Sequence, residues 1–167
     1  MNTQFLFGLD TTPRLARQLD MGRIGAVLAR NSEDLQGGPP VTAMLIQSTN
    51  PAVVAPDSLA VRQGLLREDV FVCVHEQFMT DTAKMADYVL PATMFTEHDD
   101  IYQGGGHQYI GWGPKLIDPP AECKSNHWVL CEIAKRVGAS HDAFTMSERE
   151  IIDWTLQQSG WGALHDL

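Results

Sequence analysis

Three short polar segments of this sequence carry side chains that could hold a ligand. The first is Ser48-Thr49-Asn50, the second contains His75, Glu76 and Thr80, and the third is "EHDD" at 97–100. Hydroxyls, amides and carboxylates of this kind form hydrogen bonds with polar ligands. Carboxylates beside a histidine can also coordinate a hard cation. The chemistry open to these segments is therefore ligand binding or metal-assisted hydrolysis.

The first two segments also have local explanations. Asn50-Pro51 is a common way to open a turn. Glu76 could stabilise the positive end of a helix starting near Thr80, a contribution of about 0.3–1 kcal/mol. Thr80 could simply cap that helix, which is worth about 1 kcal/mol. A carboxylate and a cap also suit a ligand that presents N–H donors, such as a guanine edge, so Glu76 alone fits both interpretations.

The acidic segment suggests a small metal-dependent hydrolase that uses Glu97, His98 and Asp100. Four adjacent residues cannot all point inward, however, and no second ligand cluster is obvious. A solvated loop or a polar pocket wall is favoured instead. The six histidines include no HExxH, which disfavours zinc. There is also no GxSxG, and the glycines of "GGGHQYIGWG" (104–113) are in the wrong order for a dinucleotide fingerprint.

Alternating strand and helix patterns must position these segments. "VTAMLIQS" (41–48) and "VFVCV" (70–74) are apolar runs typical of strands covered on both faces, and "DYVLPA" (87–92) is a third strand. Helical patterns at 57–68 and 80–86 separate the strands. Short connections imply parallel strands and right-handed crossovers. The sequence thus predicts an α/β fold, a Rossmann-like three-layer arrangement with a short, mainly parallel sheet.

In open sheets of this kind, ligands bind outside the carboxyl ends of the strands. Each of the three polar segments follows a predicted strand, so we expect one shared site. Its candidate residues are Ser48, Thr49, Asn50, His75, Glu76, Thr80, Glu97, Asp99 and Asp100. No catalytic residue and no metal ligand are assigned.

The rest of the chain is expected to complete a single domain over 1–167. Residues 1–40 would form an N-terminal helix and loop, with the helix at 12–29 broken near Gly22. Residues 41–120 would form the α/β core that binds the ligand. Residues 121–167 would hold C-terminal helices at about 125–137 and 147–158, the second opened by a capping box of Ser147 and Glu150.

The amino-acid composition of the chain limits the kinds of partner that it could bind. The net charge of −9 argues against nucleic acid, because phosphate binding needs a basic face. The sequence contains no run of 18 apolar residues, so no membrane span is predicted. The three cysteines include no CxxC pair, which disfavours a disulfide framework and structural zinc. The first residues lack the features of a signal peptide, so a cytoplasmic location is the default, although the targeting of any longer parent is unknown.

A family resemblance joins these observations. "HEQFMTDTAKMADYVLPATMFTEHDD", with "LIQSTNPAVVAPD" before it and "PPAECKSNHWVLCEIAKRVG" after it, closely resembles the molybdopterin oxidoreductases of the dimethyl sulfoxide reductase family. That family includes formate dehydrogenases and nitrate reductases. The resemblance covers about 41–138. It implies a molybdenum cofactor with two molybdopterin guanine dinucleotides, each held by a Rossmann-like domain, and transfer of an oxygen atom or a hydride equivalent.

The resemblance also implies roles for the candidate residues. Positions 48–50 would line the nucleotide pocket, Glu76 would take the place of an acid that pairs with the guanine edge, and Thr80 would line the same pocket. The loop 97–100 would approach the cofactor. A carboxylate suits this task because it can accept both guanine N–H groups.

The chain departs from the family pattern in ways that limit what it could do alone. It has no N-terminal cysteine cluster for an iron–sulfur centre and no recognisable segment that would supply the molybdenum ligand. The resemblance therefore implies a fragment, with the rest of the parent oxidoreductase as its partner and no turnover by this chain itself. The alternatives are a stand-alone Rossmann-like scaffold without cofactor, or the metal-dependent hydrolase described above.

Overall fold

The computed structural model describes residues 17–166, and contacts within the chain divide it into two compact units. One unit is Leu15–Ala92, and the other contains Thr93–Leu167. The boundary falls inside the range 41–120 that the sequence assigns to one core, because the chain after Ala92 leaves the parallel sheet and forms a separate strand pair. The single-domain assignment stays a prediction. In the part of the chain described, no helix is long and apolar enough to cross a membrane.

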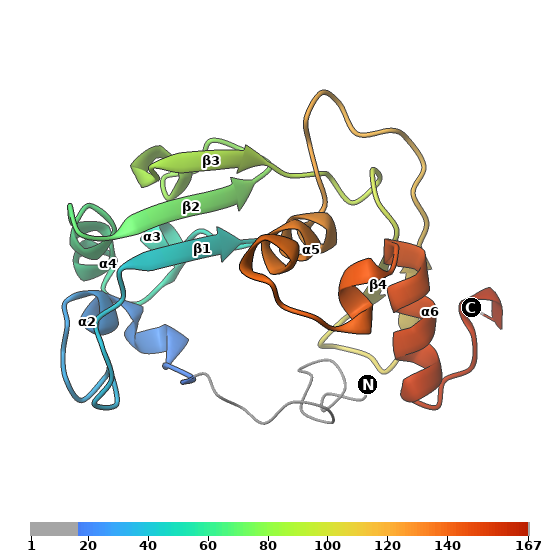
Figure 1. The fold of residues 1–167 in the computed structure, drawn as a ribbon, viewed down its shortest axis with the longest axis horizontal. Helices are drawn as coiled ribbons and strands as arrows, with labels where there is room; N and C mark the ends of the chain where they lie inside the picture. The colour runs from blue at the N-terminus through green and yellow to red at the C-terminus, as the bar shows by residue number, and fades with distance from the viewer. Residues whose placement is uncertain (1–16, 167) are drawn as a thin grey trace. The chain divides into compact units, whose positions relative to one another are not determined.

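The first unit is built on a three-stranded parallel sheet, in the order β1-β2-β3 (Figure 1). The strands are β1 (Ala43–Gln47), β2 (Phe71–Glu76) and β3 (Tyr88–Pro91). Their connections contain α3 (Pro51–Val54), α4 (Ser58–Leu65) and the 3-10 turn η2 (Ala83–Met85). The parallel α/β topology predicted from the alternating patterns is confirmed.

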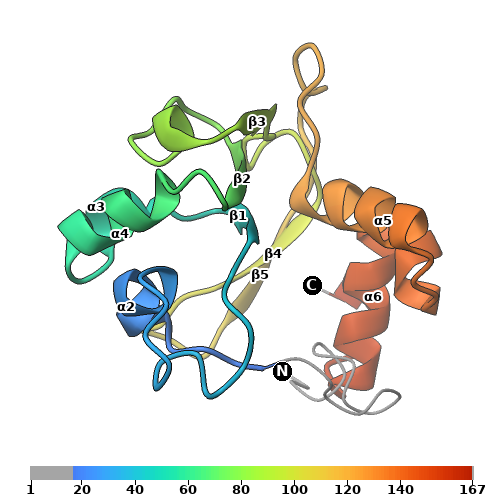
Figure 2. The same ribbon diagram turned by 60° about the vertical axis from the view of Figure 1, so that its left-hand side comes forward.

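Helices cover one face of this sheet, as Figure 2 shows for α3 and α4. Ile46, Val72 and Val74 point to that face and are buried, because side chains alternate along each strand. They pack with Leu28 of α2 (Ile24–Leu28) and with Val61 of α4. Burying such a side chain contributes about 1.5–3 kcal/mol, so this cluster stabilises the unit.

The opposite face of the sheet is apolar and open to solvent. Leu45 is 37%, Phe71 48% and Tyr88 63% exposed, and the rings of Phe71 and Tyr88 lie 5.8 Å apart. The pairing register places Leu45, Cys73 and Tyr88 in one row across the three strands. Within this unit, cover is shown on one face, and cover of the face that holds these side chains stays a prediction.

Two predicted helices are shorter than expected. Of the helix predicted at 12–29, residues 12–16 lie outside the described residues, and the described part has only η1 (Met21–Arg23) followed by α2. The Asp20 carboxylate accepts a hydrogen bond from the Gly22 N–H at 2.8 Å and so starts η1. The helix predicted at 80–86 shortens to η2, because nearby side chains bind the backbone there.

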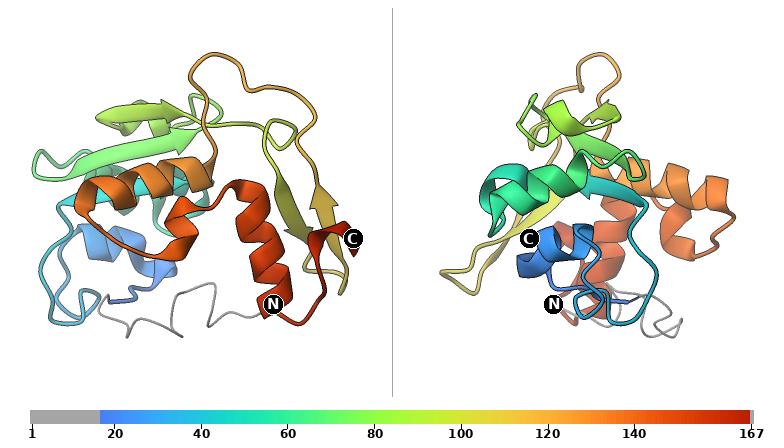
Figure 3. Two further views of the ribbon diagram at one scale, coloured as in Figure 1. Left: turned by 45° about the vertical axis from the view of Figure 1, so that its right-hand side comes forward. Right: turned by 90° about the vertical axis from the view of Figure 1, so that its left-hand side faces the viewer.

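The second unit combines a strand pair with helices. Strands β4 (Asp100–Gln103) and β5 (Ile110–Gly113) run antiparallel (Figure 3), and the sequence analysis did not anticipate them. The remaining elements are α5 (Asn126–Val137), η3 (Asp142–Thr145), α6 (Glu148–Gln158) and η4 (Leu164–Asp166). The capping box predicted from Ser147 and Glu150 is present at α6.

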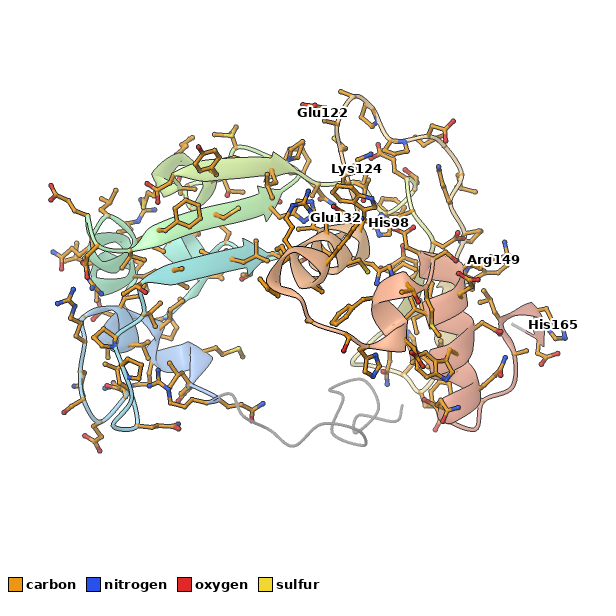
Figure 4. The ribbon with its side chains drawn as sticks, in the orientation of Figure 1. His98, Glu122, Lys124, Glu132, Arg149 and His165 are labelled. Atoms are coloured by element: carbon orange, nitrogen blue, oxygen red, sulfur yellow. The ribbon has the colours of Figure 1, made fainter. Side chains whose placement is uncertain are left out.

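Side chains of the strand pair and of α6 form the second core. Ile101, Ile110 and Trp112 pack against Ile152 and Leu156. Arg149, labelled in Figure 4, projects from α6 with its guanidinium carbon 4.8 Å from the centre of the Trp112 ring. Such cation–π contacts contribute about 0.5–1 kcal/mol at exposed sites, so this pair helps to hold the helix on the strands.

Candidate functional site

The carboxyl ends of β1 and β2 lie side by side. Gln47 and His75 are paired in register, so Ser48, which follows β1, and Glu76, which ends β2, leave the sheet at the same edge. The Gln47 amide Nε2 lies 3.1 Å from His75 Nδ1. His75 is only 1% exposed. The sequence placed these two chain segments together correctly, whereas a ligand contact by the buried His75 stays a prediction.

The turn after β1 contains an unusual backbone conformation. Ser48 has a φ of 54°, in the left-handed region that favours glycine. Such a residue typically costs about 1–3 kcal/mol and persists where the surroundings determine it. Ser48 and Thr49 are exposed, and Asn50 is half-buried. The turn delivers the chain to Pro51, whose fixed φ suits the first position of α3.

Thr82 holds this turn from the connection between β2 and β3. Its hydroxyl donates a hydrogen bond to Asn50 Oδ1 at 2.6 Å, and its backbone N–H donates to the same oxygen at 3.3 Å. The hydroxyl oxygen in turn accepts from the Ala52 N–H at 3.1 Å. Thr82 is fully buried. The three bonds join the two connections at the edge of the sheet.

The sequence analysis named Thr80 and did not name Thr82, and a ligand contact by Thr80 stays a prediction. Thr80 Oγ1 accepts from the Ala83 N–H at 3.2 Å, which is the local capping role considered as the alternative to ligand binding. Both threonines occur in "TDTA", and a pattern of residue types does not tell which of two hydroxyls turns inward.

Glu76 does not act as a partner for a helix start. Its Oε1 accepts a hydrogen bond from the N–H of Gln77, the next residue, at 2.7 Å. The N–H groups that begin η2 are bonded elsewhere, those of Ala83 and Lys84 to Thr80. The Glu76 side chain is half-buried at the sheet edge, and among residues 17–166 its Oε2 has no hydrogen-bond partner. Glu76 therefore makes no hydrogen bond to the N–H groups that begin η2, and a ligand contact by its carboxylate stays a prediction.

An ion pair braces the same edge. Arg62 of α4 donates to Asp81 at 2.6 Å and, through Nε, to the carbonyl of Ala52 at 3.2 Å. The hydrogen bond from Arg62, followed by its positive charge, lowers the pKa of Asp81 below its usual value. Asp81 directly precedes Thr82, so the pair supports the segment that holds Asn50.

The third predicted segment, 97–100, belongs to the second unit. Glu97 is nearly buried, and its Oε2 accepts from the Met94 N–H at 2.9 Å. Asp99 accepts from the Lys115 N–H at 3.2 Å, and Asp100 accepts from the N–H of the next residue at 2.8 Å. These carboxylates serve their own loop. Whether they share a site with the residues of the first unit stays a prediction.

The hydrolase alternative gains no support from this loop. His98, labelled in Figure 4, has its Nδ1 2.8 Å from Thr93 Oγ1 and its Nε2 3.7 Å from Asp100. Across the stretch 17–166, no group of three or more His, Cys, Asp or Glu side chains is arranged to hold a metal ion. In the contacts described, the polar side chains of the loop 97–100 bond to neighbouring parts of the same unit.

Comparison with known proteins identifies the family. The model of a protein family described as "Molybdopterin oxidoreductase" matches residues 6–136 of this chain. Probable oxidoreductase YoaE of Bacillus subtilis (strain 168) is 41% identical over 139 residues, which are 83% of this chain and 20% of that protein. The nitrate reductase of Symbiobacterium thermophilum is 32% identical over 122 residues, which are 73% of this chain and 16% of that protein.

A solved structure has the same fold. Acetylene hydratase from Pelobacter acetylenicus matches with a TM-score of 0.66 and 24% identity, over 84% of this chain and 19% of that chain. The chain thus corresponds to a segment of about one-fifth of the length of the curated relatives that it matches. The family resemblance noted in the sequence is confirmed, and the chain belongs to the molybdopterin oxidoreductase family.

Proposed function

We propose that this chain contributes one wall of the pocket that binds a guanine nucleotide of molybdopterin guanine dinucleotide. In the complete oxidoreductase, the molybdenum cofactor would supply oxygen-atom or hydride-equivalent transfer. The residues of this chain bind and orient the nucleotide and take no part in the redox step. A protein that carries such a cofactor mainly provides binding and orientation of this kind.

The observation that carries this proposal is the position of Glu76. Its carboxylate sits half-buried at the carboxyl edge of a parallel sheet, which is where open α/β folds bind their ligands. One oxygen accepts only the Gln77 N–H, and the other has no partner in the described part of the chain. Each carboxylate oxygen has two acceptor positions, so Glu76 can still receive two parallel N–H donors.

Guanine fits this acceptor because it presents two adjacent donors, N1–H and the 2-amino group. Hypoxanthine has N1–H but lacks the 2-amino group, and adenine has no N1–H donor. Hydrogen bonds to a charged partner are worth about 1.5–3 kcal/mol each. One lost bond of that strength lowers affinity by about tenfold or more. Recognition by Glu76 therefore requires a preference for guanosine monophosphate (GMP) over inosine monophosphate (IMP).

The test is a titration of the 167-residue chain with GMP and IMP, followed by amide NMR so that millimolar affinities are measurable. We expect the Glu76 region to respond and GMP to bind about tenfold tighter than IMP. In Glu76→Gln this preference should disappear, because an amide replaces one acceptor with a donor. Glu68→Gln, at an exposed position, is the matched control. Equal affinities for GMP and IMP in the unaltered chain would overturn the proposal.

A further inference from the structure

We infer that Asn50 is a specificity residue that presents its amide N–H₂ group, and never its carbonyl oxygen, to the ligand. The group that it takes is an oxygen acceptor, such as a phosphate, a ribose hydroxyl or a base carbonyl. This inference rests on the proposed nucleotide site. It adds a hydrogen-bond donor to a site where Glu76 is the acceptor. Glu76 accepts at the end of β2, and Asn50 donates after the end of β1.

The orientation of the Asn50 amide follows from the Thr82 backbone N–H, which can only donate, and the Thr82 hydroxyl is consistent with it. The Thr82 N–H points at the Asn50 side-chain atom 3.3 Å away, so that atom must be the oxygen. The Ala52 N–H donates to Thr82 Oγ1, so the hydroxyl must direct its own hydrogen elsewhere, and Asn50 Oδ1 lies 2.6 Å from it. Reversing the amide would set its N–H₂ group against the Thr82 N–H, which can only donate.

Because Oδ1 is committed to Thr82, Asn50 does not cap α3 with its side chain. Its Nδ2 has no hydrogen-bond partner among residues 17–166, and the side chain is only half-buried. A half-buried amide with both N–H donors available is a directional donor at the ligand-binding edge. Thr82 acts as the positioning residue, since it contacts Asn50 and is itself fully buried.

Matched variants test the oxygen and the N–H₂ group of the Asn50 amide separately. Asn50→Asp keeps an oxygen for Thr82 and replaces the N–H₂ group with a second oxygen, so the fold and the Thr82 amide signal should persist. Nucleotide affinity should fall at least about tenfold, because a donor becomes a charged acceptor. Thr82→Ser keeps the hydroxyl and should bind like the unaltered chain, whereas Thr82→Val removes one of the two hydrogen bonds that hold Asn50 Oδ1 and should bind more weakly.

The direct measurement is the pair of Asn50 side-chain N–H₂ signals in an NMR titration of the 167-residue chain. Three probes distinguish the source of the acceptor: GMP, guanosine and inorganic phosphate. A response to phosphate and GMP but not to guanosine assigns the phosphate. A response to guanosine assigns the base or ribose. This NMR measurement uses the unaltered chain, so it remains valid even if a variant fails to fold.

The outcomes separate this inference from the proposed function. If GMP is preferred over IMP but the Asn50 signals stay fixed and Asn50→Asp binds normally, the inference is overturned and the role of Glu76 stands. If the Asn50 signals respond but GMP and IMP bind equally, the donor role stands and guanine recognition by Glu76 is overturned. If none of the three probes moves the Asn50 signals, the inference is overturned.

Discussion

Asp87 and Val72 exchange two hydrogen bonds at the start of the β2–β3 pairing. The Asp87 N–H donates to the Val72 carbonyl at 2.9 Å, and the Val72 N–H donates to the Asp87 carboxylate Oδ2 at 2.7 Å. The carboxylate thus takes the place of a backbone acceptor just before β3 begins. It also fixes where β3 pairs with β2, because Cys73 and Tyr88 follow as the first partners in register.

Replacing this carboxylate should destabilise the first unit. In Asp87→Ala the Val72 N–H loses its partner, and Val72 is fully buried, so we expect a loss of about 1–3 kcal/mol in the free energy of unfolding. Asp87→Asn retains an acceptor oxygen and should lose less. The four tryptophans lie outside this unit, so unfolding in urea should be followed through amide NMR signals of β2. Equal stabilities of both variants would contradict this role.

A second expectation concerns the contact between α2 and α4. A Cβ on Gly64 would lie 2.3 Å from the Leu28 Cβ, closer than side chains approach each other. Gly64→Ala should therefore destabilise the unit by about 1–3 kcal/mol, even though alanine is the better helix former. Gln63→Ala, at an exposed position of the same helix, should change stability by less than about 0.5 kcal/mol.

The Gly64 effect can be assigned to Leu28 with a double mutant. Leu28→Ala alone should cost about 2–5 kcal/mol, because Leu28 is fully buried. Combined with Gly64→Ala, the loss should stay close to the sum, because alanine at position 28 keeps the Cβ that lies 2.3 Å from the new methyl group. A loss well below the sum would show that the outer atoms of the Leu28 side chain, and not its Cβ, make the clash.

A third expectation is a pH dependence from the Arg62–Asp81 pair. The folded-state pKa of Asp81 is lowered, so its contribution is present above the usual Asp pKa and is lost as pH falls through the lowered value. Asp81→Asn should be less stable than the unaltered chain near neutral pH, and the two should converge below about pH 4. Urea midpoints measured across this range provide the test. Because both side chains are partly exposed, added salt should shrink the difference.

The sequence was sufficient for the parallel sheet and for the neighbouring strand ends at its carboxyl edge. Apolar runs ending at Gln47 and Glu76, with a helical pattern between them, predict neighbouring strand ends whatever the details of packing. The capping box at Ser147 and Glu150 is equally local and was located correctly. These features depend on residues close together in the sequence, which is why periodicity and capping rules find them.

Features that depend on distant partners were missed. Thr82 binds Asn50, 32 positions earlier, and no local pattern indicates which threonine would do so. The pairing of β4 with β5 joins two four-residue strands, and β5 contains two glycines, whose propensity for strands is weak. The helix expected at 80–86 is shortened to η2, in a segment where the side chains of Thr80 and Asn50 take the N–H groups of Ala83 and Thr82.

The open face of the parallel sheet affects how this segment would behave if separated from a longer polypeptide. Leu45, Phe71 and Tyr88 present apolar surface to water, and β1 and β3 each pair on one side only within the described residues. Unpaired strand edges beside an apolar face are a template for self-association. For an excised segment, the hazard is then aggregation of correctly folded molecules, so solubility would limit its handling before thermal stability does.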